Sequence, residues 1–207
     1  MEQKENRVVL RGTVAGDAVF SHQVHGIDFY RFPLSVPRLS GQEDLLNILQ
    51  PIAPGENPPP QDGQFVEVVG EIRSFNNRSG VGNRLIITVL ARSVIPGQGE
   101  PCNEVLLGGV LCKSPILRRT PLGRDICDLL LAVNRRYRRA DYLPCIAWGS
   151  LALQCGRLET GDPLWLNGRL QSRTYLKTLG NTTQERTAFE ISITSLEHNE
   201  ADEAESI

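Results

Sequence analysis

Four arginines and three aromatic residues lie between positions 135 and 148, directly after an apolar run at 129–133. The apolar run has the length and composition of a buried strand, and a second short strand is expected at 142–148. Arginines can contact the phosphates of a single strand while aromatic rings stack on its bases, so this mixture on adjacent strands favours single-stranded nucleic acid as the ligand. The candidates in this stretch are Arg135, Arg136, Arg138, Arg139, Tyr137, Tyr142 and Trp148.

A second set of candidates lies on one side of a strand expected at 162–175. Because alternate side chains of a strand point to opposite faces, its leucines share a core face and its polar and aromatic residues share the outer face. The core set is Leu164, Leu166, Gly168 and Leu170, and the outer set is Trp165, Asn167, Arg169, Gln171, Arg173 and Tyr175. From the outer set, the residues assigned to the nucleic-acid surface are Trp165, Arg169, Arg173 and Tyr175.

Each candidate also has a purely structural interpretation. Trp148 could be a core residue, and the arginine run could be an ordinary solvated turn. Trp165 is equally compatible with a subunit interface and with DNA contact. Tyr137 does not follow the alternation of the preceding strand, so we expect it where the strand pattern has lapsed.

The elements that position these residues recur along the chain with a period of 97–98 residues. Segment 6–12 returns as 103–109, and segment 70–74 returns as 168–172. Asp44 and Asp141 correspond at the same spacing. A period this long, seen twice, indicates two copies of one domain rather than a solenoid.

Each copy is predicted to be an all-β barrel. The strands expected in the second copy are 103–112, 124–136, 142–148, 162–175 and 186–196, with one short helix within 150–160. Five strands with a helix after the third is the plan of the OB-fold. The first copy has a proline-rich stretch at 51–60 where the helix belongs, and prolines exclude a helix interior. The predicted fold is therefore mainly all-β, with two five-stranded OB-fold barrels in tandem and a helix between strands three and four of the second only.

Composition divides the chain into four parts. We expect a divergent OB-fold domain at 1–93, a linker rich in Pro and Gly at 94–102, a second OB-fold domain at 103–198 and an acidic disordered tail at 199–207. The whole chain has a formal charge of −2. Residues 101–198, however, hold 13 Lys and Arg against nine Asp and Glu. A mildly basic domain between acidic neighbours agrees with an anionic ligand for the second copy.

Residues 103–196 resemble the bacterial single-stranded DNA-binding protein (SSB) family. The resemblance rests on Pro115-Ile116-Leu117-Arg118, on the run from Leu131 to Tyr137, on Ala147-Trp148-Gly149 and on the run from Gly168 to Tyr175. It implies that Tyr137, Tyr142, Trp148 and Tyr175 stack on bases. The first copy has Ser40, Leu45, Pro51 and Asn77 at the equivalent positions, and Glu67 and Glu71 where the second has Trp165 and Arg169. The family's tail ends in Pro-Phe, whereas this chain ends in Glu205-Ser206-Ile207.

The resemblance further implies sequence-tolerant single-stranded DNA binding in replication, recombination or repair, and a homodimer that presents four OB-folds. Replication or repair proteins are then expected partners. The alternative is an SSB-derived accessory or primosome-type protein whose first OB-fold binds a protein partner. The acidic first copy and the absence of the Pro-Phe tip favour that alternative.

Other function classes find little support in the sequence. There is no Gly-rich phosphate loop and no assembled catalytic set, so no enzyme activity, catalytic residue or cofactor is predicted. A metal-dependent nuclease on an OB barrel would need several clustered carboxylates, and Asp125, Asp128, Asp141 and Asp162 show no such grouping. The five cysteines lack the spacing of a metal or redox site, which predicts reduced, packed thiols and a cytoplasmic protein. The resemblance to the SSB family implies that this protein is nucleoid-associated. No apolar run is long enough to span a membrane, and no signal peptide is expected.

Overall fold

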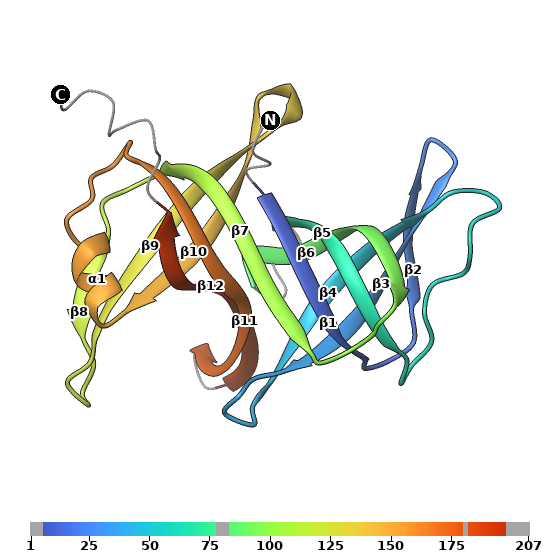
Figure 1. Ribbon diagram of the computed structural model, residues 1–207, viewed down its shortest axis with the longest axis horizontal. Helices are drawn as coiled ribbons and strands as arrows, with labels where there is room; N and C mark the ends of the chain where they lie inside the picture. The colour runs from blue at the N-terminus through green and yellow to red at the C-terminus, as the bar shows by residue number, and fades with distance from the viewer. Residues whose placement is uncertain (1–5, 78–82, 180–181, 198–207) are drawn as a thin grey trace. The chain divides into compact units, whose positions relative to one another are not determined.

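The structure is a computed structural model that describes residues 6–77, 83–179 and 182–197 (Figure 1). The acidic tail predicted at 199–207 lies outside the described residues. The strands that derive from the first repeat are β1 (Asn6–Val14), β2 (Val19–Val24), β3 (Ile27–Pro37), β4 (Glu43–Ile52), β5 (Phe65–Asn76) and β6 (Leu85–Pro96). The elements of the second repeat are β7 (Cys102–Leu111), β8 (Ile116–Arg119), β9 (Asp125–Arg135), the 3-10 turn η1 (Arg136–Arg138), β10 (Arg139–Trp148), α1 (Ser150–Cys155), β11 (Pro163–Leu179) and β12 (Thr182–Glu197).

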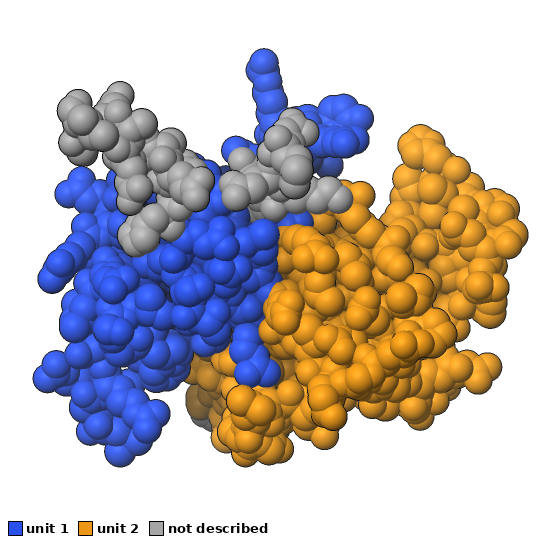
Figure 2. All heavy atoms as spheres, in the orientation of Figure 1, with its two compact units in different colours: residues 1–6, 105–169, 191–207 blue, residues 7–104, 170–190 orange. Residues whose placement is uncertain are grey.

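The chain forms two compact units that do not coincide with the two repeats (Figure 2). Unit 1 contains residues 1–6, 105–169 and 191–207, and unit 2 contains residues 7–104 and 170–190. Unit 2 therefore combines the first repeat with the C-terminal part of β11 and the N-terminal part of β12. The predicted domain boundaries at 93, 102 and 198 stay predictions.

The first repeat closes into a barrel with the strand order β2-β3-β4-β6-β5-β1, and β1 also pairs with β3. Neighbouring strands are antiparallel except β4 and β6, which run parallel where Ile48 lies opposite Val89. Alternate residues fill the interior, and Leu10, Leu34 and Leu46 are fully buried. The loop at 53–64 contains no helix, as its prolines predicted.

The second repeat has the matching order β7-β11-β12-β10-β9-β8, with β7 also paired to β9. Its parallel pair is β10 with β12, where Cys145 lies opposite Ile191. A five-stranded barrel closed in this way is the OB-fold, so the predicted fold class is confirmed. The short strands β2 and β8 add a sixth strand to each barrel, and the sequence interpretation missed both.

Glycine recurs in the repeat where the barrel strands bend over one another. A side chain at Gly109 would collide with the carbonyl oxygen of Ala132 on β9, and one at Gly12 would collide with that of Ser35 on β3. Because both collisions are with backbone, neither strand could move aside cheaply. This close approach explains why glycine occurs at both positions, which are 97 residues apart in the sequence.

The helix of the second repeat is shorter than the segment predicted for it. α1 covers Ser150–Cys155 and buries Ala152 and Cys155 against the barrel. It follows Gly149, whose φ of 59° lies in the left-handed region that glycine tolerates. Gly156 caps its C-terminus, and the Gly156 N–H donates to the carbonyl of Ala152.

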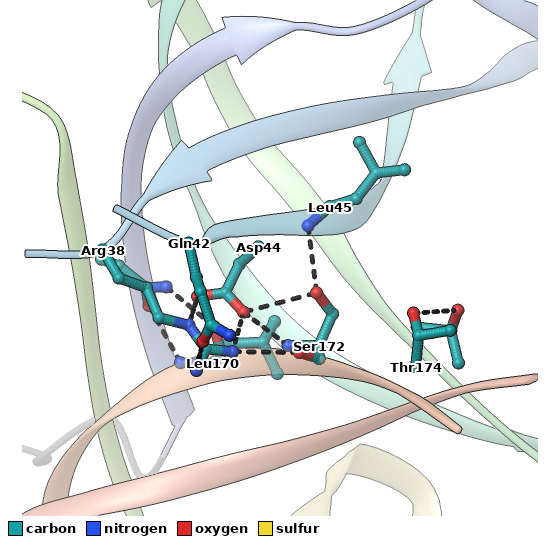
Figure 3. Close-up of polar contacts among 9 residues, drawn as sticks. Arg38, Gln42, Asp44, Leu45, Leu170, Ser172 and Thr174 are labelled. Atoms are coloured by element: carbon teal, nitrogen blue, oxygen red, sulfur yellow. Dashed lines mark hydrogen bonds and ion pairs between the residues drawn. The ribbon is translucent and has the colours of Figure 1, made fainter. Parts of the chain in front are cut away.

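Residues 170–190 join unit 2 through polar contacts with the first repeat (Figure 3). Arg38 donates to both carboxylate oxygens of Asp44, at 2.6 and 2.9 Å. The N–H of Ser172 donates to Asp44 at 2.7 Å, and the Ser172 hydroxyl accepts from the N–H of Leu45 at 3.1 Å. Arg38 also donates to the carbonyl of Ser172 at 2.9 Å. The Asp44 side chain is fully buried, so these donors satisfy a carboxylate that water does not reach.

The structure describes all five cysteines, and none of them forms a disulfide bond. Cys127, Cys145 and Cys155 are buried, and Cys102 and Cys112 are half-buried. Burial raises the pKa of the Cys155 thiol to about 11. Thiols in such surroundings behave as small apolar packing residues.

Candidate nucleic-acid interface

Two exposed aromatic residues lie on one face of β10. Tyr142 is 50% exposed and Trp148 is 42% exposed, whereas Leu143, Cys145 and Ala147 between them are buried. Alternation along the strand therefore places both rings outside the barrel, and Trp148 is not a core residue. An exposed ring on a strand is a surface on which a base can stack.

The arginine run forms the tip of the β9–β10 hairpin (Figure 1). Arg135 and Arg139 lie opposite each other as the last strand pair, and η1 connects them. Tyr137 at the centre of this turn has a φ of 63° and is 92% exposed. The strand pattern thus lapses at Tyr137, as its place in the sequence predicted, and the ring is presented to solvent from a turn.

The four arginines of the tip differ in how their charges are compensated. The Arg135 Nε lies 2.9 Å from Asp141 Oδ2, and the Asp141 side chain is fully buried. Arg136, Arg138 and Arg139 are exposed, and within the described residues none of the three has an ion-pair partner. The Arg135–Asp141 pair therefore fixes the base of the hairpin and leaves the other three cations available to an anionic ligand.

Arg118 is a surface cation that the sequence interpretation did not assign to the site. Arg118 on β8 lies opposite Ile126 on β9, which in turn lies opposite Trp148 on β10. Residues opposite each other in a sheet share a face, so Arg118 and Trp148 belong to one surface. The Arg118 Nε lies 2.6 Å from Asp128. The sequence carries no signal for this strand, because all four residues of β8 (Ile116–Arg119) are exposed and show no apolar–polar alternation.

The neighbouring pair on β8 is Arg119 with Asp125, whose Nε–Oδ1 distance is 2.8 Å. The hydrogen bond from Arg119 holds the pKa of Asp125 below its ordinary value. Asp125 and Asp128 therefore each have an arginine partner at this edge of the sheet. Within the described residues, no group of three or more His, Cys, Asp or Glu side chains could hold a metal ion.

Trp165 and Arg169 lie on β11, which β12 separates from β10. Leu164, Leu166 and Leu170 are buried, so the predicted alternation of this strand is confirmed. Trp165 is half-buried against β7, where a side chain at Gly108 would come within 2.6 Å of the indole nitrogen. The structure thus does not place Trp165 and Arg169 on the same strand pair as Tyr142 and Trp148.

Arg173 and Tyr175 lie on the half of β11 that belongs to unit 2. The Arg173 guanidinium lies over the Tyr175 ring, 6.0 Å from its centroid. Arg173 is exposed and Tyr175 is half-buried. A cation over an aromatic face is a favourable arrangement that still leaves the guanidinium edge for a phosphate.

The first repeat has no ring at the four positions equivalent to Tyr137, Tyr142, Trp148 and Tyr175. Leu45 is exposed, and Asn77 donates to the carbonyl of Asn83 at 3.0 Å. The acids of its fourth strand have internal partners, since Glu67 lies 3.3 Å from Arg11 and Glu71 accepts from Arg92 and Arg73. The face of β5 is therefore less acidic than its sequence suggests.

No helix in the described part of the chain combines the length and the apolar character needed to cross a membrane.

Comparison with known proteins identifies the second repeat. The model of the single-strand binding protein family matches residues 102–199. Single-stranded DNA-binding protein 1 of Clostridium acetobutylicum is 36% identical over 87 residues, which cover 38% of this chain and 79% of that protein. Single-stranded DNA-binding protein A of Bacillus subtilis is 39% identical over 80 residues, which cover 35% of this chain and 46% of that protein. The chain spans about half the length of most of the curated relatives it matches.

Solved structures extend the similarity over both repeats. The wild-type single-stranded DNA binding protein from Thermus aquaticus superposes with a TM-score of 0.74 at 25% identity, and the match covers 94% of this chain and 92% of that one. A deletion mutant of the same protein gives a TM-score of 0.73 at 24% identity, with 96% of each chain covered. The fold of nearly the whole chain therefore has a known counterpart.

Proposed function

Because the chain belongs to the single-strand binding protein family, we propose that it binds single-stranded DNA, mainly through the surface of its second repeat. The family consists of DNA-binding proteins and not of enzymes. Binding is sequence-tolerant, because rings and arginines recognise features that every base and every phosphate share.

The observation that carries this proposal is the pair of exposed rings on β10 beside an arginine-rich hairpin tip. Tyr142 and Trp148 offer two stacking surfaces on one strand. Arg136, Arg138 and Arg139 supply the positive charge along which a backbone can run. Tyr137 at the tip adds a third ring, and Arg173 with Tyr175 extends the candidate set on unit 2.

The test is a titration of the full chain with oligo-dT, comparing wild type with Tyr142→Ala combined with Trp148→Ala. Each lost stack costs about 1–3 kcal/mol, so the double variant is expected to bind about 2–6 kcal/mol more weakly if the two effects add. Leu45→Ala is the matched control, because Leu45 occupies the position of Tyr142 in the first repeat and is equally exposed. Its affinity should stay within a few tenths of a kcal/mol of wild type, since it has no ring to lose.

Circular dichroism and urea unfolding must show that the double variant is folded. Both rings are about half exposed, so their removal leaves the core intact. A folded double variant with wild-type affinity would refute the proposed site. Wild type that does not bind oligo-dT at low salt would refute the function.

The finer parts of the proposal concern the assembly and its setting. The chain forms a homodimer that presents four OB-folds, with Trp165 at the contact between copies. It acts in the cytoplasm, on the nucleoid, in replication, recombination or repair, together with proteins of those processes. The half-buried indole on Gly108 supports the role of Trp165, because an aromatic residue on an outer strand face often packs at an interface. Light scattering that shows a monomer at micromolar concentration would exclude the dimer.

A further inference from the structure

An acidic side chain, Asp128 on β9, lies on the same surface of the second barrel as Trp148. Trp148 on β10 is opposite Ile126 on β9, and Asp128 is two residues further along β9, on the same face. The Asp128 side chain is 39% exposed. A carboxylate beside a ring that stacks on bases repels the phosphates that join those bases. Its presence on this surface therefore needs an explanation.

The partner of Asp128 is a cation of the edge strand β8. Arg118 Nε donates to Asp128 Oδ2 at 2.6 Å, and Arg118 Nη2 donates to Asp128 Oδ1 at 3.3 Å. A guanidinium binds a phosphate with the same two-pronged geometry. Asp128 and a phosphate of a bound strand would therefore compete for the same donors of Arg118.

The exposure of the pair argues against a purely structural role. The Arg118 side chain is 51% exposed, and exposed ion pairs contribute little to folding stability. The backbone ladder from Ile116 to Arg119 already joins β8 to β9. The two side chains can therefore separate at a small cost in free energy.

A second pair on the same two strands provides a comparison. Arg119 Nε lies 2.8 Å from Asp125 Oδ1. Arg119 and Asp125 are opposite each other in the ladder, and alternation places them on the other side of the strand pair from Arg118 and Asp128. These two strands thus carry two arginine–aspartate pairs, and one of the two lies on the candidate nucleic-acid surface.

We propose that Asp128 attenuates the affinity of the second repeat for single-stranded DNA by competing with a phosphate for the Arg118 guanidinium. This inference rests on the proposed function of the chain and adds to it a residue that sets the strength of binding. In the free protein, the carboxylate neutralises Arg118. When DNA binds, a phosphate displaces Asp128 from Arg118, and the separation of the ion pair lowers the affinity.

The test titrates the full chain with labelled oligo-dT at several salt concentrations. Asp128→Asn keeps the size of the side chain and removes its charge. Asp125→Asn is the matched control, because it removes the same charge from the pair on the other side of the strands. The double variant Arg118→Gln with Asp128→Asn has the same net charge as wild type, so a difference between these two proteins comes from the pair and not from overall charge.

We expect Asp128→Asn to bind oligo-dT about fivefold more tightly than wild type at low salt, which is the factor that corresponds to one close ion pair in water. Asp125→Asn should stay within about twofold of wild type, since phosphates on the Trp148 face do not meet Asp125. The double variant should give a slope of log affinity against log salt concentration that is shallower than that of wild type by about 0.7, because it lacks the phosphate contact of Arg118. Urea unfolding of Asp128→Asn should have the wild-type midpoint.

Each other result has a defined meaning. Affinity of Asp128→Asn within twofold of wild type would overturn the inference and leave the proposed function standing. Weaker binding together with a lower urea midpoint would show that the pair only fastens β8 to β9, and the inference would be wrong. A double variant with the wild-type slope would mean that Asp128 acts through net charge alone, which also overturns the inference. Wild type that does not bind oligo-dT at low salt would instead overturn the proposed function itself.

Discussion

The backbone N–H of Ser172 donates a hydrogen bond to the buried carboxylate of Asp44 at 2.7 Å, although the two residues are 128 positions apart in sequence. The contact joins the distal half of β11 to the β4 strand of the first repeat. Asp44 also forms an ion pair with Arg38, and the carboxylate raises the pKa of that guanidinium. Four donor atoms, two from Arg38 and two from Ser172, thus converge on one acid, and the stability of unit 2 should depend on it.

Removal of the Ser172 hydroxyl should therefore destabilise the protein. Ser172→Ala loses the contacts with Leu45 N–H at 3.1 Å and with Asp44 at 3.3 Å. The contact with Asp44 is partly buried and the contact with Leu45 is exposed. Together they should contribute about 1 kcal/mol, so urea unfolding should show a loss of that size. Thr174→Ala is the control on the same strand, since its contact with Thr187 is exposed and 3.5 Å long. Equal stabilities of the two variants would contradict the prediction.

The arginines of the hairpin tip should differ in their effect on the salt dependence of binding. Each phosphate contact adds about −0.7 to the slope of log affinity plotted against log salt concentration. Arg136→Gln and Arg138→Gln should each reduce the slope by about that amount, because their charges have no internal partner among the described residues. Arg135→Gln combined with Asp141→Asn should leave the slope unchanged, since the pair is already neutral as a unit. Both partners are changed so that no buried carboxylate is left without its cation. If this double variant changes the slope as much as Arg136→Gln does, Arg135 contacts phosphate.

Tyr137 should be a residue whose replacement stabilises the fold and weakens binding. Its φ of 63° is unfavourable for an aromatic residue and costs about 1 kcal/mol, whereas asparagine tolerates this region better. Tyr137→Asn should therefore raise the unfolding free energy by up to about 1 kcal/mol. It should weaken oligo-dT binding by about 1–3 kcal/mol through loss of a stack. A variant that gains stability and keeps its affinity would mean that Tyr137 does not touch DNA.

The buried thiols should respond to pH in a defined direction. Burial raises the pKa of Cys155 to about 11, above the 9.0 of an unperturbed thiol. The native thiol keeps its proton where the unfolded one has lost it, so this contribution to stability is complete below pH 9 and falls as the pH rises towards 11. Urea unfolding of wild type and Cys155→Ala at pH 8, 9.5 and 10.5 should show a steeper loss for wild type. Parallel profiles would contradict the assignment.

The same burial predicts slow reaction of Cys155 with iodoacetamide, because the thiolate is the reactive form. Half-buried Cys102 and Cys112 should be alkylated first in the native protein. Mass spectrometry of partially alkylated protein gives the order. Labelling of Cys155 before Cys112 would show that α1 opens readily.

The fold was predictable because apolar–polar alternation and turn residues are local features of the sequence and occur in both repeats. Alternation along β11 separated Leu164 and Leu166 from Trp165 correctly, and the prolines after β4 excluded a helix. The short strands β2 and β8 were missed because a strand of four to six residues has too little periodicity, and its pairing with β3 or β9 depends on residues farther along the chain.

The candidate site was predictable only where a side chain's role follows from its own strand. Tyr142 and Trp148 face outwards by alternation alone. The pairing of Arg135 with Asp141 depends on the register of β9 against β10, and the pairing of Arg118 with Asp128 depends on the register of β8 against β9. The register between two strands cannot be inferred from the sequence of either strand alone, so these two relationships appeared only in the structure.

The dependence of unit 2 on residues 170–190 constrains the order of folding during protein synthesis. A ribosome adds about 5–20 residues per second. Ser172 is therefore incorporated roughly 6–25 seconds after Asp44. During that interval the first barrel has emerged, but its buried acid lacks donors from β11. Unit 2 therefore gains these last contacts only when the second repeat is almost fully synthesised, so the final packing of the first repeat follows the synthesis of the second.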